Sequence, residues 1–114
     1  MPYVKLQTNL EMDAEKSLAV IKKLSAHTAE ILGKPESSVQ AVLEPVPHII
    51  FGGREQISAF IDLRSVGLGG DKTPEVAARL GEFLQNELAI GPDKAYIAFT
   101  NISRDMWGFK GSTL

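Results

Sequence analysis

The sequence predicts an α+β domain in which two helices pack on one face of a four-stranded mixed sheet. A β-α-β order of elements occurs twice along the 114 residues. The first helix ends with Ile-Leu-Gly-Lys-Pro at residues 31–35, and the second with the similar sequence Ala-Ile-Gly-Pro-Asp at residues 89–93. Because a crossover helix joins parallel strands, a tandem β-α-β repeat predicts two parallel strand pairs with both helices over one sheet face. The length fits a single domain over residues 1–114.

The first half is expected to contain a strand, a helix and a second strand. Residues 3–8 alternate between apolar and polar side chains, which is typical of a strand with one buried face. Asp13 is a suitable N-cap for a helix over residues 14–32, and Gly33 is expected to end it. The second strand is expected over residues 39–44. The apolar stripe of the helix consists of Leu18, Ile21, Leu24, Thr28 and Ile31.

The second half repeats this order. Residues 57–64 show the most regular apolar–polar alternation of the chain and predict a strand. After a glycine-rich loop, Thr73 as N-cap and Pro74 at the first helical position predict the start of a helix. Gly91 and the proline after it are expected to end this helix, and residues 95–100 form the last long strand. The buried stripe of the helix consists of Val76, Leu80, Phe83, Leu84 and Leu88.

Composition and charge exclude several classes of function. The chain is 44% hydrophobic and 23% charged, as in ordinary soluble proteins. Its net charge of −2 offers no basic stripe, so neither nucleic acid nor a membrane is an expected partner. The chain has no cysteine, which excludes disulfides, thiolate metal ligands and thiol catalysis. With no apparent signal peptide or membrane span, a cytoplasmic location is expected, and export without a signal peptide is left open.

Two motifs with a superficial likeness to binding sites are rejected. The loop Gly-Leu-Gly-Gly-Asp-Lys-Thr at residues 67–73 resembles a phosphate loop, but Asp71 separates glycine from lysine and would repel phosphate. His27 and His48 have no second ligand at metal spacing. We therefore expect no bound nucleotide, no metal site and no other cofactor.

Pro2 is a candidate general base. Methionine before a small residue is usually removed, and removal of Met1 would expose the secondary amine of Pro2. An ordinary α-amino group titrates near ~7.7–8.0, and burial or a neighbouring cation lowers the pKa of an amine. Such an amine is neutral near physiological pH and can take a proton from a carbon next to a carbonyl. The alternative is that proline is merely tolerated at the start of the chain.

Three further segments have both a structural and a functional interpretation. Lys34 follows a helix end, where the helix dipole favours a cation, but it is also suited to bind a carboxylate and to lower the pKa of the Pro2 amine. Tyr96 is either a half-buried strand residue or part of a site. Ser65 and Val66 end a strand before a glycine, where they form either a plain turn or a backbone site for an oxyanion or carboxylate.

Taken together, these segments resemble the macrophage migration inhibitory factor family of the tautomerase superfamily. The resemblance extends over the whole chain. It rests on the order and spacing of Met1-Pro2, Thr8-Asn9, Leu32-Gly33-Lys34-Pro35, Phe51-Gly52-Gly53, Ser65-Val66-Gly67, Tyr96-Ile97 and the tail Trp107-Gly108-Phe109-Lys110-Gly111-Ser112-Thr113-Leu114.

The resemblance implies a homotrimer with three active sites at subunit interfaces, and an isomerase that tautomerises phenylpyruvate-like α-keto acids and dopachrome-like compounds. A homotrimer would also cover the sheet face that the helices leave open, on which we expect apolar residues. By position, Pro2 would be the catalytic base. The carboxylate of a small aromatic keto acid would be held by Lys34, Ser65 and the backbone of Val66. The neighbouring subunit would supply Tyr96 and Ala98. The apolar mouth would be lined by Trp107, Phe109 and Leu114.

Several positions depart from the family pattern. A family asparagine near the site is Ala98 here, and a tyrosine at the pocket edge is Ser38. A family histidine is Arg64, and the Cys-x-x-Cys motif is replaced at residues 58–61, so oxidoreductase activity is not expected. Because the candidate base and the carboxylate-binding lysine are retained, an enzyme is favoured. The substitutions leave open a cytokine-like or intracellular protein-interaction module with a vestigial pocket.

Overall fold

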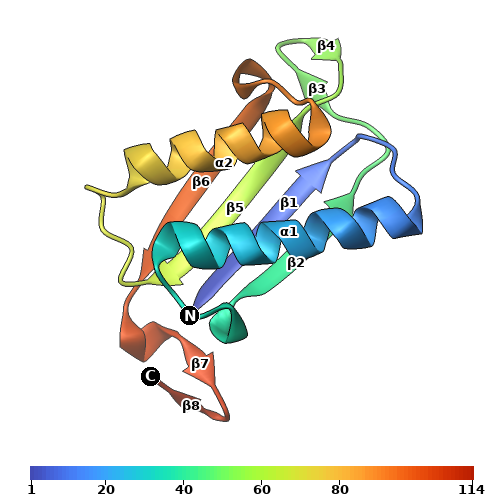
Figure 1. Ribbon diagram of the computed structural model, residues 1–114. Coiled ribbons are helices and arrows are strands. Elements are labelled where there is room, and N and C mark those ends of the chain that lie inside the picture. Colours follow the sequence, from blue (N-terminus) through green and yellow to red (C-terminus); the bar gives the residue numbers. More distant parts are fainter.

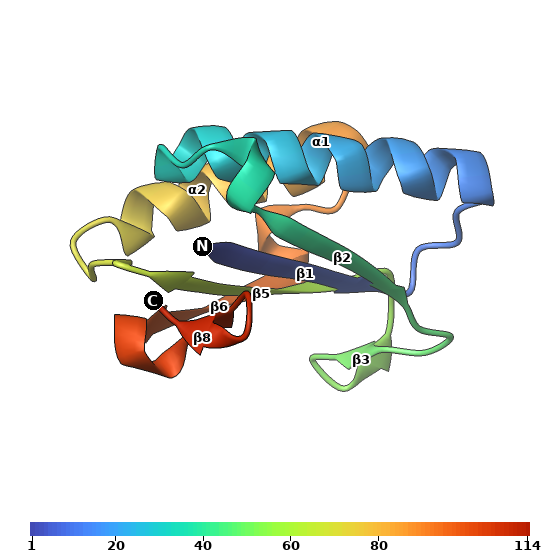
Figure 2. The ribbon, with the colours of Figure 1, turned by 90° about the horizontal axis from the view of Figure 1, so that it is seen from below.

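The computed structural model describes all 114 residues and contains a four-stranded sheet with two long helices on one face (Figure 1). The strands of the sheet are β1 (Pro2–Thr8), β2 (Gln40–Pro45), β5 (Ala59–Val66) and β6 (Ala95–Ile102). The helices are α1 (Ala14–Leu32) and α2 (Thr73–Leu88). Both helices lie on the same side of the sheet (Figure 2). No helix is long and apolar enough to cross a membrane.

Two small hairpins and three short 3₁₀ helices complete the chain, and none of them is predicted by the sequence pattern. The hairpins are β3 (Ile50–Phe51) with β4 (Arg54–Glu55), and β7 (Gly108–Phe109) with β8 (Ser112–Thr113). The 3₁₀ helices are η1 (Glu36–Ser38), η2 (Pro92–Lys94) and η3 (Arg104–Met106). The strands of the two hairpins have only two residues each, which is too short for a period-two pattern to be visible in the sequence.

The strand order β2-β1-β5-β6 confirms the tandem β-α-β organisation. β1 and β2 are parallel, as are β5 and β6, because each pair is joined by a crossover helix. The two halves meet at β1 and β5, which are antiparallel. The predicted α+β class, with two helices on a mixed four-stranded sheet, is therefore correct.

The core lies between the sheet and the two helices. The predicted stripe of α2 is buried at all five positions. The stripe of α1 is only partly correct, because Leu24 and Thr28 are buried whereas Leu18 is 54% exposed and Val20 is buried in its place. At 3.6 residues per turn, Leu18 lies about 120° around the helix from Leu24, and so points away from the sheet.

The first helix begins and ends where the sequence predicts. Asp13 is the N-cap, and its Oδ1 accepts a hydrogen bond from the backbone N–H of Lys16 at 2.8 Å. Gly33 closes the helix in the left-handed conformation with φ of +63°, which glycine adopts at little cost. Capping rules therefore predicted both ends of α1.

The limits of α2 differ from the prediction. The N-cap is Lys72 and not Thr73, whose hydroxyl instead donates to the carbonyl of Gly70 at 2.9 Å. Pro74 does lie in the first turn. The helix ends at Leu88, because Ala89 takes the left-handed conformation with φ of +54°. The expected stop, Gly91, is extended with φ of −67° and precedes η2.

The sheet face without helices is less apolar than predicted. Exposed Phe60 and Tyr96 contribute apolar surface there, but charged side chains lie between and around them. Lys5 pairs with Glu44 at 3.4 Å, and the Arg64 guanidinium, which pairs with Asp62, lies 5.5 Å from the ring centre of Tyr3. This face is therefore a mixed surface of ion pairs and aromatic rings.

Candidate active site

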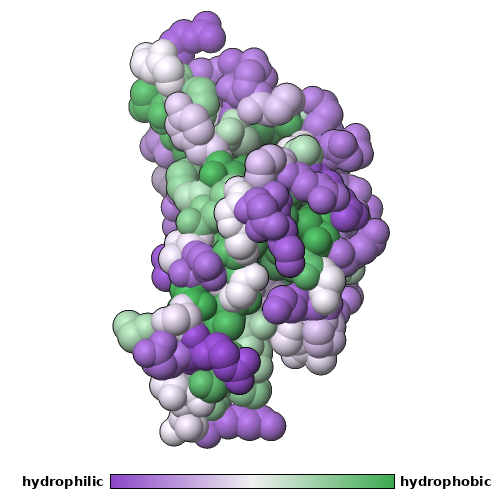
Figure 3. Space-filling view, turned by 90° about the vertical axis from the view of Figure 1, so that its left-hand side faces the viewer, coloured by the Kyte–Doolittle hydropathy of each residue, from purple (hydrophilic) through white to green (hydrophobic).

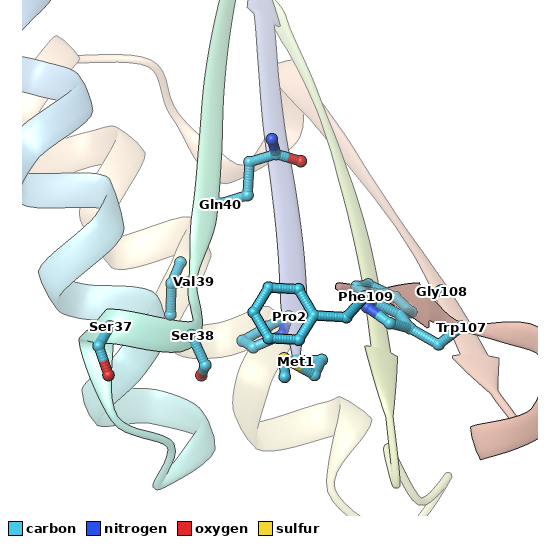
Figure 4. Close-up of a pocket in the computed structure, with 9 residues that line it drawn as sticks. All are labelled: Met1, Pro2, Ser37, Ser38, Val39, Gln40, Trp107, Gly108 and Phe109. Atoms are coloured by element: carbon cyan, nitrogen blue, oxygen red, sulfur yellow. The ribbon is translucent and has the colours of Figure 1, made fainter. Parts of the chain in front are cut away.

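A cavity of about 610 Å³ lies at the end of the sheet where the chain begins (Figure 4). It is formed by three segments that are far apart in the sequence: the start of β1, the stretch from η1 into β2, and the start of the tail hairpin. In Figure 4 Ser37 and Ser38 lie to the left of Pro2, Trp107 lies to its right, and the Phe109 ring overlaps Pro2 in the view. The lining residues are Met1, Pro2, Ser37, Ser38, Val39, Gln40, Trp107, Gly108 and Phe109.

Pro2 is the first residue of β1, and its side chain is less than 2% exposed. Proline is tolerated at this position because the first residue of a strand need not donate an N–H to the ladder. The alternation of β1 places Pro2 on the same buried face as Val4 and Leu6, and Ser65 of β5 lies opposite it. The rigid ring is therefore held in one place at the cavity wall.

A second cavity, of about 220 Å³, lies at the same end of the sheet. Ser65, the strand partner of Pro2, lines it. It is bounded by the end of α1, the end of β5 and the loop that enters α2. Its lining residues are Leu32, Gly33, Lys34, Ser65, Gly67, Leu68 and Lys72.

The N-terminal amine of the chain has a pKa below the ordinary value of an α-amino group. Partial burial is the larger cause, and the positive charge of Lys34 is the second. The backbone N–H of Lys34 donates to the carbonyl of Ala29 at 2.9 Å, which fixes Lys34 at the end of α1. The amine of Met1, which directly precedes β1, therefore loses its proton more easily than an exposed amine.

The tail hairpin positions the aromatic wall of the larger cavity. Its turn contains two left-handed residues, Lys110 and Gly111, with φ of +55° and +74°. The N–H of Leu114 donates to the carbonyls of Trp107 and Arg104, at 3.2 Å each. Leu114 thus secures the tail behind Trp107, and it is not among the residues that line the cavity.

A family model matches the chain from end to end. The model is described as macrophage migration inhibitory factor (MIF), and the match covers residues 1–114. The chain belongs to the macrophage migration inhibitory factor family. The resemblance that the sequence motifs indicated is therefore confirmed.

Individual relatives of this family member agree over nearly its whole length. A macrophage migration inhibitory factor homolog of Brugia malayi is 37% identical over 114 residues, with 99% of this chain and 98% of the relative covered. D-dopachrome decarboxylase of Bos taurus is 32% identical, with 100% and 98% covered. The solved structure of the macrophage migration inhibitory factor from Trichinella spiralis superposes with a TM-score of 0.89 at 29% identity, covering 98% of this chain and 99% of that one.

In this member of the family, Tyr96 and Ala98 lie far from the Pro2 of the same chain. Tyr96 lies opposite Phe60, which in turn lies opposite Gln7, so Tyr96 is near the far end of the sheet. At about 3.3 Å per residue this is roughly 17 Å along the strand direction. Tyr96 is 65% exposed, and its ring centre lies 5.0 Å from that of Phe51. Ala98 lies two residues along the same exposed face of β6.

The other residues expected from the family pattern fall into two groups. Pro2, Trp107 and Phe109 line the larger cavity, whereas Lys34 and Ser65 line the smaller one. Val66 ends β5 beside Ser65, and its carbonyl accepts a hydrogen bond from the Ser65 hydroxyl at 3.2 Å. The Val66 carbonyl is therefore already engaged by a neighbouring side chain.

Several lining residues were not expected from the sequence. The larger cavity includes Ser37, Val39 and Gln40, and the smaller one includes Lys72. A signal for the first three was present: β1 and β2 were predicted to be parallel, so the residues that enter β2 lie at the same sheet edge as Pro2. No group of three or more histidine, aspartate or glutamate side chains lies close enough to hold a metal ion.

Proposed function

We propose that the chain is a keto–enol tautomerase for phenylpyruvate-like α-keto acids and dopachrome-like compounds, with the Pro2 nitrogen as general base. The observation that carries this proposal is the position of Pro2 and Met1 in the wall of the larger cavity, where burial and the charge of Lys34 lower the pKa of the Met1 amine. When Met1 is removed, the amine moves to Pro2, whose side chain is buried. A neutral amine in this place is suited to abstract a proton at neutral pH.

The proposed reaction moves one proton from carbon to oxygen. The Pro2 nitrogen takes a proton from C3 of the keto acid, the electron pair of that C–H bond forms the C2=C3 double bond, and the C2=O π pair moves to the oxygen. The protonated amine then returns the proton to that oxygen, which yields the enol and restores the neutral base. General base catalysis of this kind is typically worth ~10²–10⁴-fold.

The two cavities divide the substrate between them. The carboxylate of the keto acid binds in the smaller cavity, where Lys34 donates a charge-assisted hydrogen bond that gives both affinity and orientation, and Ser65 turns its hydroxyl from the Val66 carbonyl to the substrate. The aromatic ring of the substrate lies against Trp107 and Phe109 in the larger cavity, because large aromatic surfaces gain most from burial. The carbon next to the carbonyl then lies between them, near Pro2.

The complete site requires more than one copy of the chain, and we propose a homotrimer. Tyr96 and Ala98 lie on the exposed sheet face, far from the Pro2 of their own chain. The mixed surface of that face, with its exposed Phe60 and Tyr96, is suited to cover a neighbouring subunit. In this assembly Tyr96 of one subunit approaches the cavity of the next.

The test of the proposed function is a phenylpyruvate assay on protein whose N-terminus is known. Intact-mass measurement first establishes whether Met1 has been removed, and ultraviolet absorbance then follows the conversion between keto and enol forms. Protein that begins with Pro2 should turn over phenylpyruvate. If it shows no activity above buffer, the function proposed here is wrong.

A cytokine-like or intracellular protein-interaction module is the second candidate. The observation that favours it is the departure of two positions from the family pattern: Ala98 on the exposed sheet face lacks the amide of asparagine, and Ser38 at the cavity wall lacks the aromatic ring of tyrosine. Inactive protein that is correctly processed at Pro2 and trimeric in solution would favour this second function.

A further inference from the structure

The smaller cavity contains two lysines, although binding of one carboxylate requires only one. Lys34 follows the C-terminal end of α1, and Lys72 is the N-cap residue of α2. Ser65, which is 1% exposed, lies in the wall of the same cavity. The side of the molecule that carries the loop into α2 has hydrophilic residues with apolar ones between them (Figure 3). Two cations from different elements therefore border one small space.

Neither lysine is neutralised by a carboxylate of the chain. All six ion pairs within 4.0 Å involve other residues. The nearest acidic neighbour in sequence, Asp71, has its carboxylate over the backbone of Gly69. The Lys72 side chain makes no hydrogen bond, and it makes no capping contact with α2. The side chains of Lys34 and Lys72 are thus both free to bind an anion from outside.

The loop that carries Lys72 is fixed by contacts with the sheet. The N–H of Leu68 donates to Oδ1 of Asn101 at 3.1 Å, and Leu68 itself is 4% exposed. The N–H of Lys72 donates to the carbonyl of Gly69 at 3.0 Å in a tight turn. Because the backbone on both sides of the cavity is held in place, little backbone freedom is lost when an anion binds, and this lowers the entropic cost of binding.

We propose that Lys72 is a specificity-determining residue that selects short 2-oxo dicarboxylates, with one carboxylate on Lys34 and the second on Lys72. This inference rests on the proposed function, because the first carboxylate and the reacting carbon are placed as described there. Two separate cations suit two separate carboxylates better than one. A four-carbon 2-oxo diacid carries its acidic C3 hydrogens between its two carboxylates. With both carboxylates on the lysines, C3 would face the Ser65 wall of the smaller cavity, where Pro2 is the strand partner of Ser65, so Pro2 is still the base and the proton transfer is unchanged.

The test compares oxaloacetate with phenylpyruvate as substrates of the processed protein. Lys72→Ala and Lys72→Gln should lower the ratio of kcat/KM for oxaloacetate to that for phenylpyruvate by about tenfold, the usual worth of one charge-assisted hydrogen bond. Lys72→Arg should restore most of the ratio. Lys22→Ala, which removes an exposed lysine from α1, is the matched control and should leave the ratio unchanged.

Binding of unreactive anions separates this inference from the function proposed above. Succinate should bind the processed protein more tightly than butyrate in calorimetry, and Lys72→Gln should remove that difference. If succinate binds no more tightly than butyrate, or if the substrate ratio is the same in all Lys72 variants, Lys72 has no role in specificity even when phenylpyruvate is turned over. If Lys72-dependent succinate binding occurs without any turnover, the dicarboxylate site stands and the tautomerase function fails.

Discussion

Pro2 lies directly opposite Ser65 where the antiparallel strands β1 and β5 join the two halves of the chain. This pairing brings the first residues of β1 to the same sheet edge as the end of β5 and the loop that follows. The larger cavity contains Pro2 and the smaller one contains Ser65. One strand pair therefore places the candidate base beside the candidate carboxylate site.

Blocking the Pro2 nitrogen should remove nearly all activity. An added residue, or Met1 that is retained, converts the amine into an amide, which is not basic. Pro2→Gly keeps a free amine but loses the rigid ring, so part of the activity should survive. Intact mass and phenylpyruvate turnover should be measured on each preparation. Full activity in a preparation that retains Met1 would contradict the assignment of Pro2 as base.

Lys34→Ala should change both the KM and the pH profile. The lost carboxylate contact should raise the KM for phenylpyruvate by about tenfold. Because the charge of Lys34 helps to lower the pKa of the N-terminal amine, its removal should shift the rising limb of kcat/KM against pH to higher pH. The direction follows because the amine is active only when deprotonated. Arginine at this position should keep the pH profile, and a shift to lower pH in Lys34→Ala would disprove the electrostatic role.

The assembly should be a trimer with shared sites. Light scattering at micromolar concentration should give about three times 12.4 kDa. A Pro2-blocked chain and a Tyr96→Ala chain should each have low activity alone. When the two are unfolded together and refolded, some sites contain an intact Pro2 beside an intact Tyr96, so part of the activity should return. A monomeric mass, or no recovery in the mixture, would rule out the shared site.

The two helix ends should respond in opposite ways to an exchange of glycine and alanine. Both Gly33 and Ala89 are left-handed C-cap residues, and a residue with a Cβ costs roughly 1 kcal/mol more than glycine in this conformation. Gly33→Ala should therefore destabilise the fold by about 1 kcal/mol, and Ala89→Gly should stabilise it by a similar amount. Urea unfolding of the two variants measures this. Equal effects of the same sign would show that the cap conformation does not control stability here.

Elements with a strong local pattern were predictable from the sequence. The Asp13 cap, the Gly33 stop and the buried stripe of α2 follow from side-chain chemistry within a few residues. The end of α2 does not follow from local chemistry. Ala89 adopts the left-handed conformation despite its Cβ, while Gly91, two residues later, is extended. Propensity favours Gly91 as a stop, but the chain must turn earlier for Ile90, which is 2% exposed, to enter the core.

The sequence indicated individual candidate residues, but it did not indicate which residues line a common cavity. The motifs predicted Pro2 and Lys34, and the family resemblance implied that Tyr96 would come from another subunit. Ser37, Gln40 and Lys72 have no motif of their own, and they line a cavity only because parallel strands and helix ends meet at one sheet edge. Which segments come together at the end of the sheet depends on the strand register, and a single sequence does not reveal that register.

The antiparallel junction of the two halves has a further consequence for how many reactive centres a chain holds. β5 is the counterpart of β1 in the repeated unit, but its first residue, Ala59, lies opposite Thr8 at the other end of the sheet. The nitrogen of Ala59 is an amide bonded to Ser58, whereas the nitrogen of Pro2 becomes a free amine when Met1 is removed, as the proposed function requires. The repeated β-α-β unit in the second half therefore has no counterpart of that free amine. The two halves share one fold, but under the proposed function only the first half provides a general base, so each chain would hold one.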